Sequence, residues 1–255
     1  MLQMKYMGSK ARIAKYILPI ILKDRKPDQW YVEPFVGGAN VINKVTGNRL
    51  GADINKYLIA MFKGLQDDCF RKFNHSKAHY DLVREEYNRG TNFNFTDFYI
   101  GYVGFMASAN GRFFDGGYSG KSDTKIGTVR NYIDESIRGM EKHIPTLNGI
   151  DFVCSGFLDL KIPDNSIVYC DIPYKNTKQY AFSKGFDHDD FWDWAREKVN
   201  QGHKVFVSEY SAPEDFTCVW QQEVKSSLSA NGKAGGNKKS IEKLFVHNSQ
   251  VDCAI

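Results

Sequence analysis

The sequence lacks the marks of several large protein classes. Its five cysteines are scattered, with no Cys-x-x-Cys and no paired spacing, so we expect neither a disulfide framework nor a zinc ribbon, and we infer a reducing compartment. No apolar run approaches the roughly 18 residues of a membrane span. Basic residues interrupt the apolar ones throughout the start of the chain, which is unlike a signal peptide. We therefore expect a soluble, cytoplasmic protein without a membrane partner.

A strong excess of one charge is also missing. The 255 residues include 34 Lys and Arg against 30 Asp and Glu, which gives a net charge of +4. Such a mild basic excess permits nucleic-acid binding without requiring it. The length and the 42% hydrophobic content suffice for one large domain, or for one domain that carries an insertion.

Strand and helix patterns alternate at the start of the chain and return near its end. Residues 30–36 form an aromatic and β-branched run that stops at Gly37-Gly38, and residues 41–45 then show a helical period. A second run, residues 49–52, reaches Asp53 and precedes a helical pattern. Alternation of this kind predicts a parallel sheet. Later predicted elements are strands at 152–154, 167–170 and 205–207, a helix at 191–199, and a hairpin within 219–246.

The middle of the chain has a looser pattern. Helical stretches occur near residues 80–87 and 98–105, and a glycine-rich, basic and aromatic stretch follows at 110–130. This contrast predicts a mainly helical insert over residues 66–150. Residues 1–65 and 151–255 would then form one α/β domain.

A tetrapeptide at a predicted strand end has the groups needed to activate an amino nitrogen. Asp171-Ile172-Pro173-Tyr174 directly follows the apolar residues 166–170. A carboxylate and a carbonyl beside a proline-fixed bend can accept both hydrogens of an exocyclic amino group, and the tyrosine ring can stack on the base. This is chemistry for methylating a nucleobase. Asp-x-Pro turns also end strands in many folds without any chemistry, so the tetrapeptide alone does not decide the function.

A glycine turn between a strand and a helix suggests a nucleotide-like cofactor. The segment Glu33-Pro34-Phe35-Val36-Gly37-Gly38-Ala39-Asn40 ends a strand, and its glycines let the backbone approach a ligand. Asp53 ends the next predicted strand, where an acidic side chain can bind a ribose diol. The Gly-x-Gly-x-x-Gly pattern is absent, which argues against a nicotinamide cofactor.

Taken together, four motifs resemble the Dam-like DNA adenine methyltransferases in their order and spacing. They are Tyr6-Met7-Gly8-Ser9-Lys10, Tyr31-Val32-Glu33-Pro34-Phe35-Val36-Gly37-Gly38, Ala52-Asp53-Ile54-Asn55 and Asp171-Ile172-Pro173-Tyr174. The resemblance implies an α/β, Rossmann-like methyltransferase domain with a mixed, mostly parallel seven-stranded sheet and an inserted target-recognition domain. It also implies methyl transfer from S-adenosylmethionine to the amino nitrogen of adenine in double-stranded DNA, after base flipping and without a metal.

The resemblance assigns residues to each part of this site. Asp171, Pro173 and Tyr174 would be catalytic. The cofactor would be held by Tyr6, Lys10, Glu33, Phe35, Gly37, Asp53, Phe157 and Asp171. The glycine-rich part of the insert and the tail supply basic candidates for DNA contacts, namely Arg112, Lys121, Lys125, Arg130, Lys238 and Lys239.

Two positions depart from the family pattern. Ile172 replaces the first proline of the usual catalytic motif, but the acceptor there is a main-chain carbonyl, which isoleucine also supplies. Gly156 precedes Phe157 where relatives often carry an acidic residue. Alternative functions are methylation of RNA adenine, DNA cytosine or protein glutamine, or a DNA-binding relic without turnover. Pairing with a restriction enzyme, the recognised sequence and the oligomeric state stay open.

One further motif follows the predicted strand at 205–207. Ser208-Glu209-Tyr210-Ser211 places a serine after a strand, as hydrolases do, but it lacks the flanking glycines of a nucleophile elbow. We therefore expect these residues to form a strand-end loop near the catalytic turn.

Overall fold

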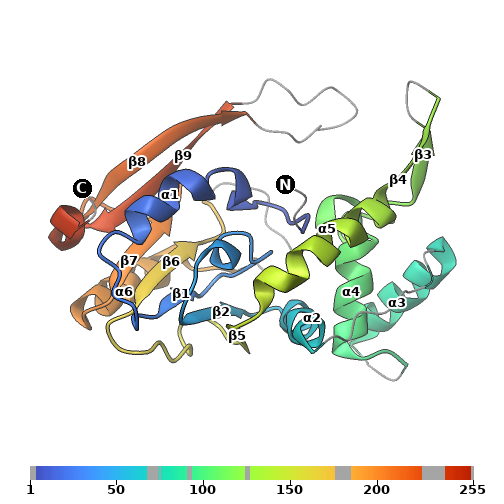
Figure 1. Ribbon diagram of the computed structural model, residues 1–255, viewed down its shortest axis with the longest axis horizontal. Coiled ribbons are helices and arrows are strands. Elements are labelled where there is room, and N and C mark those ends of the chain that lie inside the picture. Colours follow the sequence, from blue (N-terminus) through green and yellow to red (C-terminus); the bar gives the residue numbers. More distant parts are fainter. Residues whose placement is uncertain are drawn as a thin grey trace. The chain divides into compact units, whose positions relative to one another are not determined.

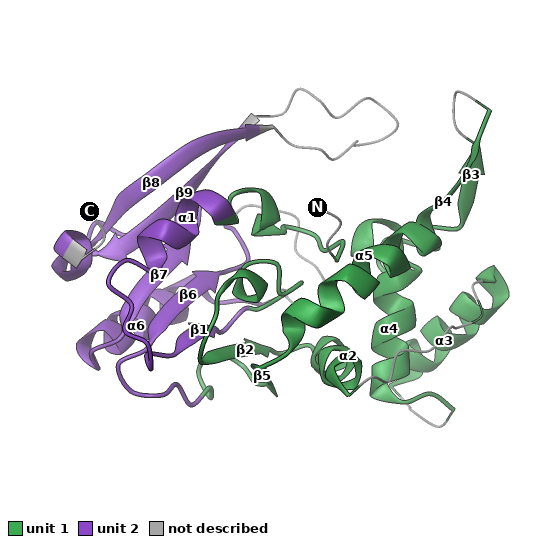
Figure 2. Ribbon diagram, in the orientation of Figure 1, with its two compact units in different colours: residues 1–14, 36–160 green, residues 15–35, 161–255 purple. Residues whose placement is uncertain are grey.

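The chain divides into two compact units, each continuous in space but not in sequence (Figure 2). The computed structural model describes residues 4–67, 74, 76–90, 94–123, 127–175, 185–225 and 239–253. Unit 1 consists of Met1–Ala14 and Val36–Leu160, and unit 2 consists of Lys15–Phe35 and Lys161–Ile255. The boundaries predicted for the insert, at residues 66 and 150, stay a prediction.

The main sheet is mixed and mostly parallel, as predicted. Its strand order is β5-β2-β1-β6-β7-β9-β8. The pairs β2/β5, β1/β6 and β6/β7 are parallel, whereas β9 runs antiparallel to both β7 and β8. The strands are β1 (Tyr31–Glu33), β2 (Arg49–Asp53), β5 (Ile150–Cys154), β6 (Ile167–Asp171), β7 (Lys204–Ser208), β8 (Phe216–Lys225) and β9 (Lys239–His247). The predicted terminal hairpin is β8–β9.

Among its described residues, unit 1 carries four complete α-helices besides β2 and β5. These are α2 (Lys56–Gln66), α3 (Lys77–Arg89), α4 (Asp97–Met106) and α5 (Tyr132–Leu147). Each begins after a side chain that accepts hydrogen bonds from first-turn amides, as helix N-termini require. A two-stranded hairpin, β3 (Lys121–Asp123) and β4 (Val129–Asn131), leads into α5 and extends away from its N-terminal end (Figure 1).

The helix predicted after the glycine turn is wrong. Residues 41–45 contain only a single 3-10 turn, η2 (Ile42–Lys44). Val45 returns to an extended conformation and Gly47 adopts a φ of 77°. β-Branched residues lose side-chain freedom in a helix, and a left-handed glycine ends one, so the apolar spacing here reports burial and not a helix.

Helices α2 and α4 approach each other through glycines. A Cβ at Gly101 of α4 would lie 2.1 Å from the carbonyl oxygen of Tyr57 in α2. A Cβ at Gly64 of α2 would lie 2.3 Å from the ring of Phe98. The small residues therefore set the spacing of this helix pair.

Gly101→Ala is expected to lower the free energy of unfolding by about 1–3 kcal/mol. An exposed helical Gly→Ala change would raise it by about 1 kcal/mol, so the sign of the effect isolates the clash with Tyr57. Urea denaturation measures it. Gly156→Ala is the control, because the nearest atom to a Cβ there is 3.8 Å away. Equal stability of the Gly101→Ala variant and the wild type would contradict the close approach.

Unit 2 is organised around large buried aromatic side chains. Tyr31, Tyr169 and Phe191 are all at most 1% exposed. The helix α6 (His188–Asn200) begins after Asp187, whose carboxylate accepts from two first-turn amides. Helix α1 (Ala14–Ile21), most of which belongs to unit 2, contains Pro19 and is only 8 residues long. No helix within the described ranges has the length and apolar content needed to cross a membrane.

Candidate active site

Asp53 in unit 1 is the last residue of β2, and its side chain lies beside the glycine turn at Gly37. Its Oδ2 accepts a hydrogen bond from the Gly37 amide at 3.2 Å, and its Oδ1 accepts one from the Asn55 amide at 2.9 Å. Burial raises the pKa of this carboxyl group to about 6, and the two amide hydrogen bonds oppose that rise. The structure therefore places an acceptor whose protonation depends on pH beside the glycine turn.

The glycines of this turn seat an aromatic ring. A Cβ at Gly37 would lie 2.8 Å from Cε1 of Tyr6, and one at Gly38 would lie 2.6 Å from the Cβ of the same tyrosine. On another side, the ring of Tyr6 stacks with Phe105 at 5.9 Å between centroids. The predicted cofactor residues Tyr6, Gly37 and Asp53 thus come together, and the glycines are required by the tyrosine itself.

Two other predicted cofactor residues of unit 1 take different positions. Lys10 is only 8% exposed, and its Nζ donates to the carbonyl of Gly8 at 3.2 Å. Phe157 is half-buried just after β5. The segment before it is tied to the end of β2, because the Ser155 amide donates to the Asp53 carbonyl at 3.1 Å.

The predicted catalytic turn, Asp171 to Tyr174, lies in unit 2, at the end of β6. Asp171 is the last residue of that strand and is half-buried. The hydroxyl of Tyr174 donates to Oε2 of Glu242 in β9 at 2.8 Å. Its ring also packs edge-on against Tyr210, with centroids 4.6 Å apart. The tyrosine that we expect to stack on the base is therefore held at its hydroxyl group and by a perpendicular ring contact.

The backbone of the same turn is held by two further side chains. Glu209 accepts a hydrogen bond from the Lys175 amide at 2.9 Å, and His188 contacts the carbonyl oxygen of Pro173 at 2.9 Å. The structure confirms that the loop after β7 lies at the catalytic turn. Sequence reasoning missed the roles of Glu209, His188 and Glu242, although an acidic residue directly after a buried strand was a usable signal.

Glu33 and Phe35 also belong to unit 2. Glu33 is 3% exposed, and its Oε1 accepts from the hydroxyl of Tyr31 at 2.8 Å. Burial, and secondarily the Glu33 charge, raise the pKa of Tyr31 well above its usual value. Phe35 packs edge-on against Phe186 and Phe191. Glu33 thus lies in the interior of its unit, and the half-buried Phe35 packs against aromatic rings there.

The predicted DNA contacts occupy different settings. Lys121 is exposed on β3, whereas Arg130 on β4 forms a two-pronged hydrogen bond with Glu135 at 2.5 and 2.8 Å. This pairing raises the pKa of Arg130 and lowers that of Glu135. The Nε of Arg112 is buried, with no hydrogen-bond partner among the described residues. Lys125, Lys238 and the side chain of Lys239 lie outside the described part of the chain.

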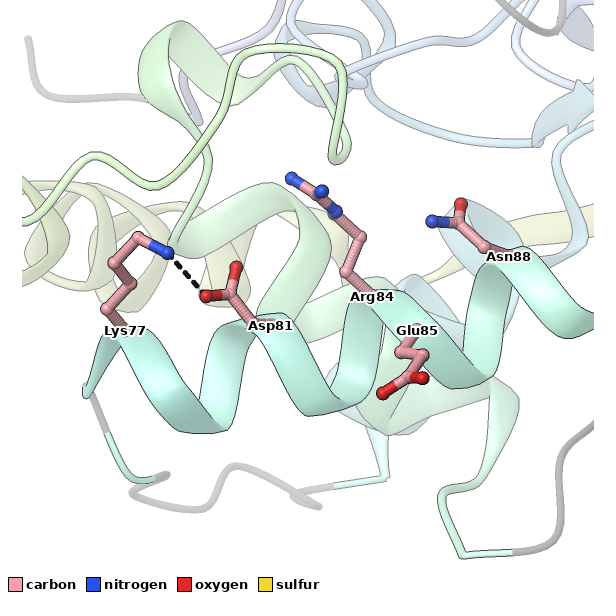
Figure 3. A pocket seen from close by; sticks show the side chains of 5 residues that line it. All are labelled: Lys77, Asp81, Arg84, Glu85 and Asn88. Carbon is pink, nitrogen blue, oxygen red and sulfur yellow. Dashed lines mark hydrogen bonds and ion pairs between the residues drawn. The ribbon is translucent and has the colours of Figure 1, made fainter.

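One surface hollow lies along α3, away from the predicted site residues in the sequence (Figure 3). Its lining is entirely polar or charged and includes an ion pair between Lys77 and Asp81. Ligand pockets are mostly apolar with a few polar groups, so this hollow lacks the character of a binding site. The residues that line it are Lys77, Asp81, Arg84, Glu85 and Asn88. Within the described ranges, no cluster of three or more His, Cys, Asp or Glu side chains could hold a metal.

Comparison with known proteins agrees with the motifs. The family model of D12 class N6 adenine-specific DNA methyltransferases matches residues 6–228, a span that begins at Tyr6 and includes the catalytic turn. A relative, the retron Ec67 DNA adenine methylase of Escherichia coli, is 28% identical over 251 residues. The alignment covers 86% of this chain and 83% of the relative.

The match decides among the alternatives raised by the sequence. It supports adenine in DNA over RNA adenine, DNA cytosine and protein glutamine. The resemblance predicted from four short motifs is confirmed, and with it the enzyme class. The chain belongs to the D12 class N6 adenine-specific DNA methyltransferases.

Proposed function

We propose that the enzyme moves a methyl group from S-adenosylmethionine to the amino nitrogen of adenine flipped out of double-stranded DNA. The observation that carries this proposal is the turn at the end of β6, where Asp171, Pro173 and Tyr174 stand in a braced backbone. Because the comparisons identify adenine methylation in DNA, a turn of acceptors beside a fixed aromatic ring is the natural place for the chemistry.

Unit 2 would act on the adenine. The amino nitrogen of adenine is a weak nucleophile because its lone pair is delocalised into the ring. The Asp171 carboxylate and the Ile172 carbonyl accept its two hydrogens and draw it towards a tetrahedral geometry, which localises the lone pair. Stacking on Tyr174 offsets part of the few kcal/mol that base flipping costs.

Unit 1 would supply most of the cofactor contacts. The buried Asp53 carboxylate, held by two amides, suits the diol of a ribose, and the Tyr6 ring beside Gly37 offers an aromatic wall. Phe157 follows the strand next to β2 and suits stacking on an adenine ring. This acceptor and these rings fit S-adenosylmethionine, which when bound supplies an electrophilic methyl group. Lys10, Glu33, Phe35 and Asp171 complete the proposed cofactor residues.

The experiment that tests the proposal uses labelled S-adenosylmethionine with duplex DNA, the same sequence as single strands, and duplex RNA. We expect label in N6-methyladenine from the duplex DNA alone. Cofactor binding measured by calorimetry, without transfer to any of the three, would contradict the proposed activity and favour a DNA-binding relic or a substrate other than DNA. Greater transfer to the single strands would show that the enzyme does not flip its base from a duplex.

We further propose that the β3–β4 hairpin contacts DNA phosphates through Lys121 and Arg130. Lys121→Ala is expected to reduce the slope of log Kd against log salt by about 0.9, the value of one lost phosphate contact. Fluorescence anisotropy at several salt concentrations measures this slope. Lys142→Ala on α5 is the control, because it removes an exposed cation outside the hairpin. The same slope in Lys121→Ala and wild type would remove Lys121 from the interface.

A further inference from the structure

A buried carboxylate lies against the catalytic turn, although burying such a group is energetically unfavourable. Glu209 is 2% exposed, and its two oxygens accept hydrogen bonds from the amides of Lys175, at 2.9 Å, and of Tyr210, at 2.6 Å. Burying an ionised carboxylate is unfavourable unless such bonds satisfy its oxygens. Lys175 directly follows the proposed catalytic tyrosine, so this buried acceptor holds the backbone at one end of the turn.

A histidine holds the other side of the same tyrosine. Nε2 of His188, the first residue of α6, lies 2.9 Å from the carbonyl oxygen of Pro173 and 3.9 Å from Oε2 of Glu209. A carbonyl oxygen can only accept, so Nε2 must carry the proton and donate it. Its ring is only 14% exposed and packs edge-on against Phe186, at 5.0 Å between centroids. The imidazole is therefore held in place by contacts of its own.

These two side chains hold the two peptide groups that flank Tyr174. The Pro173 carbonyl belongs to the peptide before the tyrosine, and the Lys175 amide belongs to the peptide after it. The proline ring already fixes its own φ near −65°. With both flanking peptides held, the direction in which the Tyr174 side chain leaves the backbone is determined, and its bond to Glu242 fixes the far end.

We propose that Glu209 and His188 are positioning residues for methyl transfer, which fix the turn from Pro173 to Lys175 in its reactive geometry. The inference rests on the proposed catalytic role of that turn. Neither side chain need touch the base. A misplacement of about 1 Å in a reacting group lowers a rate by roughly 10²-fold, so loss of either hydrogen bond reduces catalysis without removing a catalytic group.

A purely structural role predicts a different pattern of effects. If Glu209 only stabilised the fold, its loss would lower the melting temperature and would reduce cofactor binding and turnover together, through the folded fraction. A positioning role lowers the single-turnover rate at saturating DNA and cofactor, with little change in KM for DNA or in cofactor affinity.

The first test compares Glu209→Leu with Glu209→Gln. Leucine fills the buried space without an acceptor, whereas glutamine keeps an oxygen for the Lys175 amide. We expect Glu209→Leu to lose about 10²-fold in the single-turnover rate and Glu209→Gln to recover most of that loss. Calorimetry for the cofactor and a thermal melt accompany each variant. Equal losses in both variants, or a wild-type rate in Glu209→Leu, would overturn the proposal.

The second test uses the histidine, and it decides the question if Glu209→Leu does not fold. His188→Gln keeps an N–H close to the position of Nε2, whereas His188→Phe removes it. We expect the glutamine variant to be the faster of the two by about 10-fold, since one net hydrogen bond is worth about 1 kcal/mol or slightly more. Equal rates would exclude a positioning role for His188.

Two more variants, Glu209→Leu/His188→Phe and Asp171→Ala, distinguish failure of the positioning role from failure of the proposed function. Since Glu209 and His188 act on one turn, the loss in Glu209→Leu/His188→Phe should fall short of the product of the single losses. Multiplicative losses would show independent roles and contradict the shared one. Asp171→Ala tests the turn itself, and full activity of this variant would contradict the proposed function. If Asp171→Ala is inactive but Glu209→Leu and His188→Phe both have the wild-type rate, only the positioning role is contradicted.

Discussion

Asp171→Ala is expected to lower the single-turnover rate of DNA methylation by at least about 10²–10³-fold. This is the range observed when one preorganised polar group that stabilises a transition state is removed. Without the carboxylate, the adenine amino group loses one of its two proposed acceptors, and its lone pair stays delocalised. The backbone pairing of Asp171 with Ser208 between β6 and β7 does not depend on the side chain, so the fold should persist.

Asp171→Asn provides a graded comparison. The amide keeps one carbonyl acceptor but loses the negative charge, and charge-assisted hydrogen bonds are roughly twice as strong as neutral ones. The rate of this variant should therefore lie between those of wild type and Asp171→Ala. Single-turnover assays with labelled methyl donor separate the chemical step from product release. A wild-type rate in the alanine variant would place the chemistry elsewhere in the chain.

The parts of this molecule that sequence predicted well are those where local chemistry and strand ends coincide. Asp53 and Asp171 each follow a buried run, and each ends a parallel strand, β2 and β6. In an open parallel sheet, residues at the carboxyl ends of strands are the ones positioned for ligands. The predicted helices near residues 80–87 and 98–105 also lie within α3 and α4, because their apolar periods extend over several turns.

The parts that sequence could not supply depend on contacts between distant segments. Tyr6 meets Gly37 and Gly38 across some thirty residues, so the sequence alone does not show that the glycines also make room for a ring. Likewise, the apolar spacing at residues 41–45 marks buried side chains on a single 3-10 turn. In both cases the deciding contacts come from tertiary packing and not from the local pattern.

The side chains that hold the catalytic turn show the same limit of sequence-based prediction. His188, Glu209 and Glu242 come from α6, the loop after β7, and β9. No spacing rule in the sequence links them, because β6, β7 and β9 become neighbours only through the order of the strands in the folded sheet. Arg130 is a further example, because the sequence does not show that its guanidinium forms a two-pronged hydrogen bond with Glu135, five residues later.

Asp53 leads to the second large effect, a pH-dependent loss of cofactor binding. Burial raises the pKa of its carboxyl group to about 6, so the group becomes protonated just below neutral pH. The ionised form accepts hydrogen bonds from both hydroxyls of a ribose more strongly than the protonated form, in which one oxygen carries a hydrogen. The Kd for S-adenosylmethionine should therefore be flat above pH 7 and rise by up to about tenfold per pH unit below pH 6.

Asp53→Asn is the matched variant, because its carbonyl oxygen still accepts from a backbone amide at the turn. Hydrogen bonds to a charged group contribute about 1.5–3 kcal/mol, so loss of one such bond predicts an affinity lower by about 10–100-fold. The remaining affinity should no longer change between pH 7 and 5. Isothermal calorimetry across this range measures both effects. Equal affinities for variant and wild type, or an unchanged wild-type Kd from pH 8 to 5, would remove Asp53 from the cofactor site.

Asp53→Asn should not lower the stability of the ligand-free fold at pH 7, although it lowers the affinity for the cofactor. A carboxyl group whose folded-state pKa is raised contributes stability that is fully present below its unfolded pKa, 3.8, and is lost as pH rises through about 6. At pH 7 the buried charge of Asp53 therefore destabilises the fold. The asparagine variant should melt at or above the wild-type temperature at pH 7 while binding the cofactor more weakly. If Asp53 serves in binding, its replacement should lower the cofactor affinity without lowering the melting temperature. If Asp53 serves only the fold, its replacement should lower the affinity and the melting temperature together.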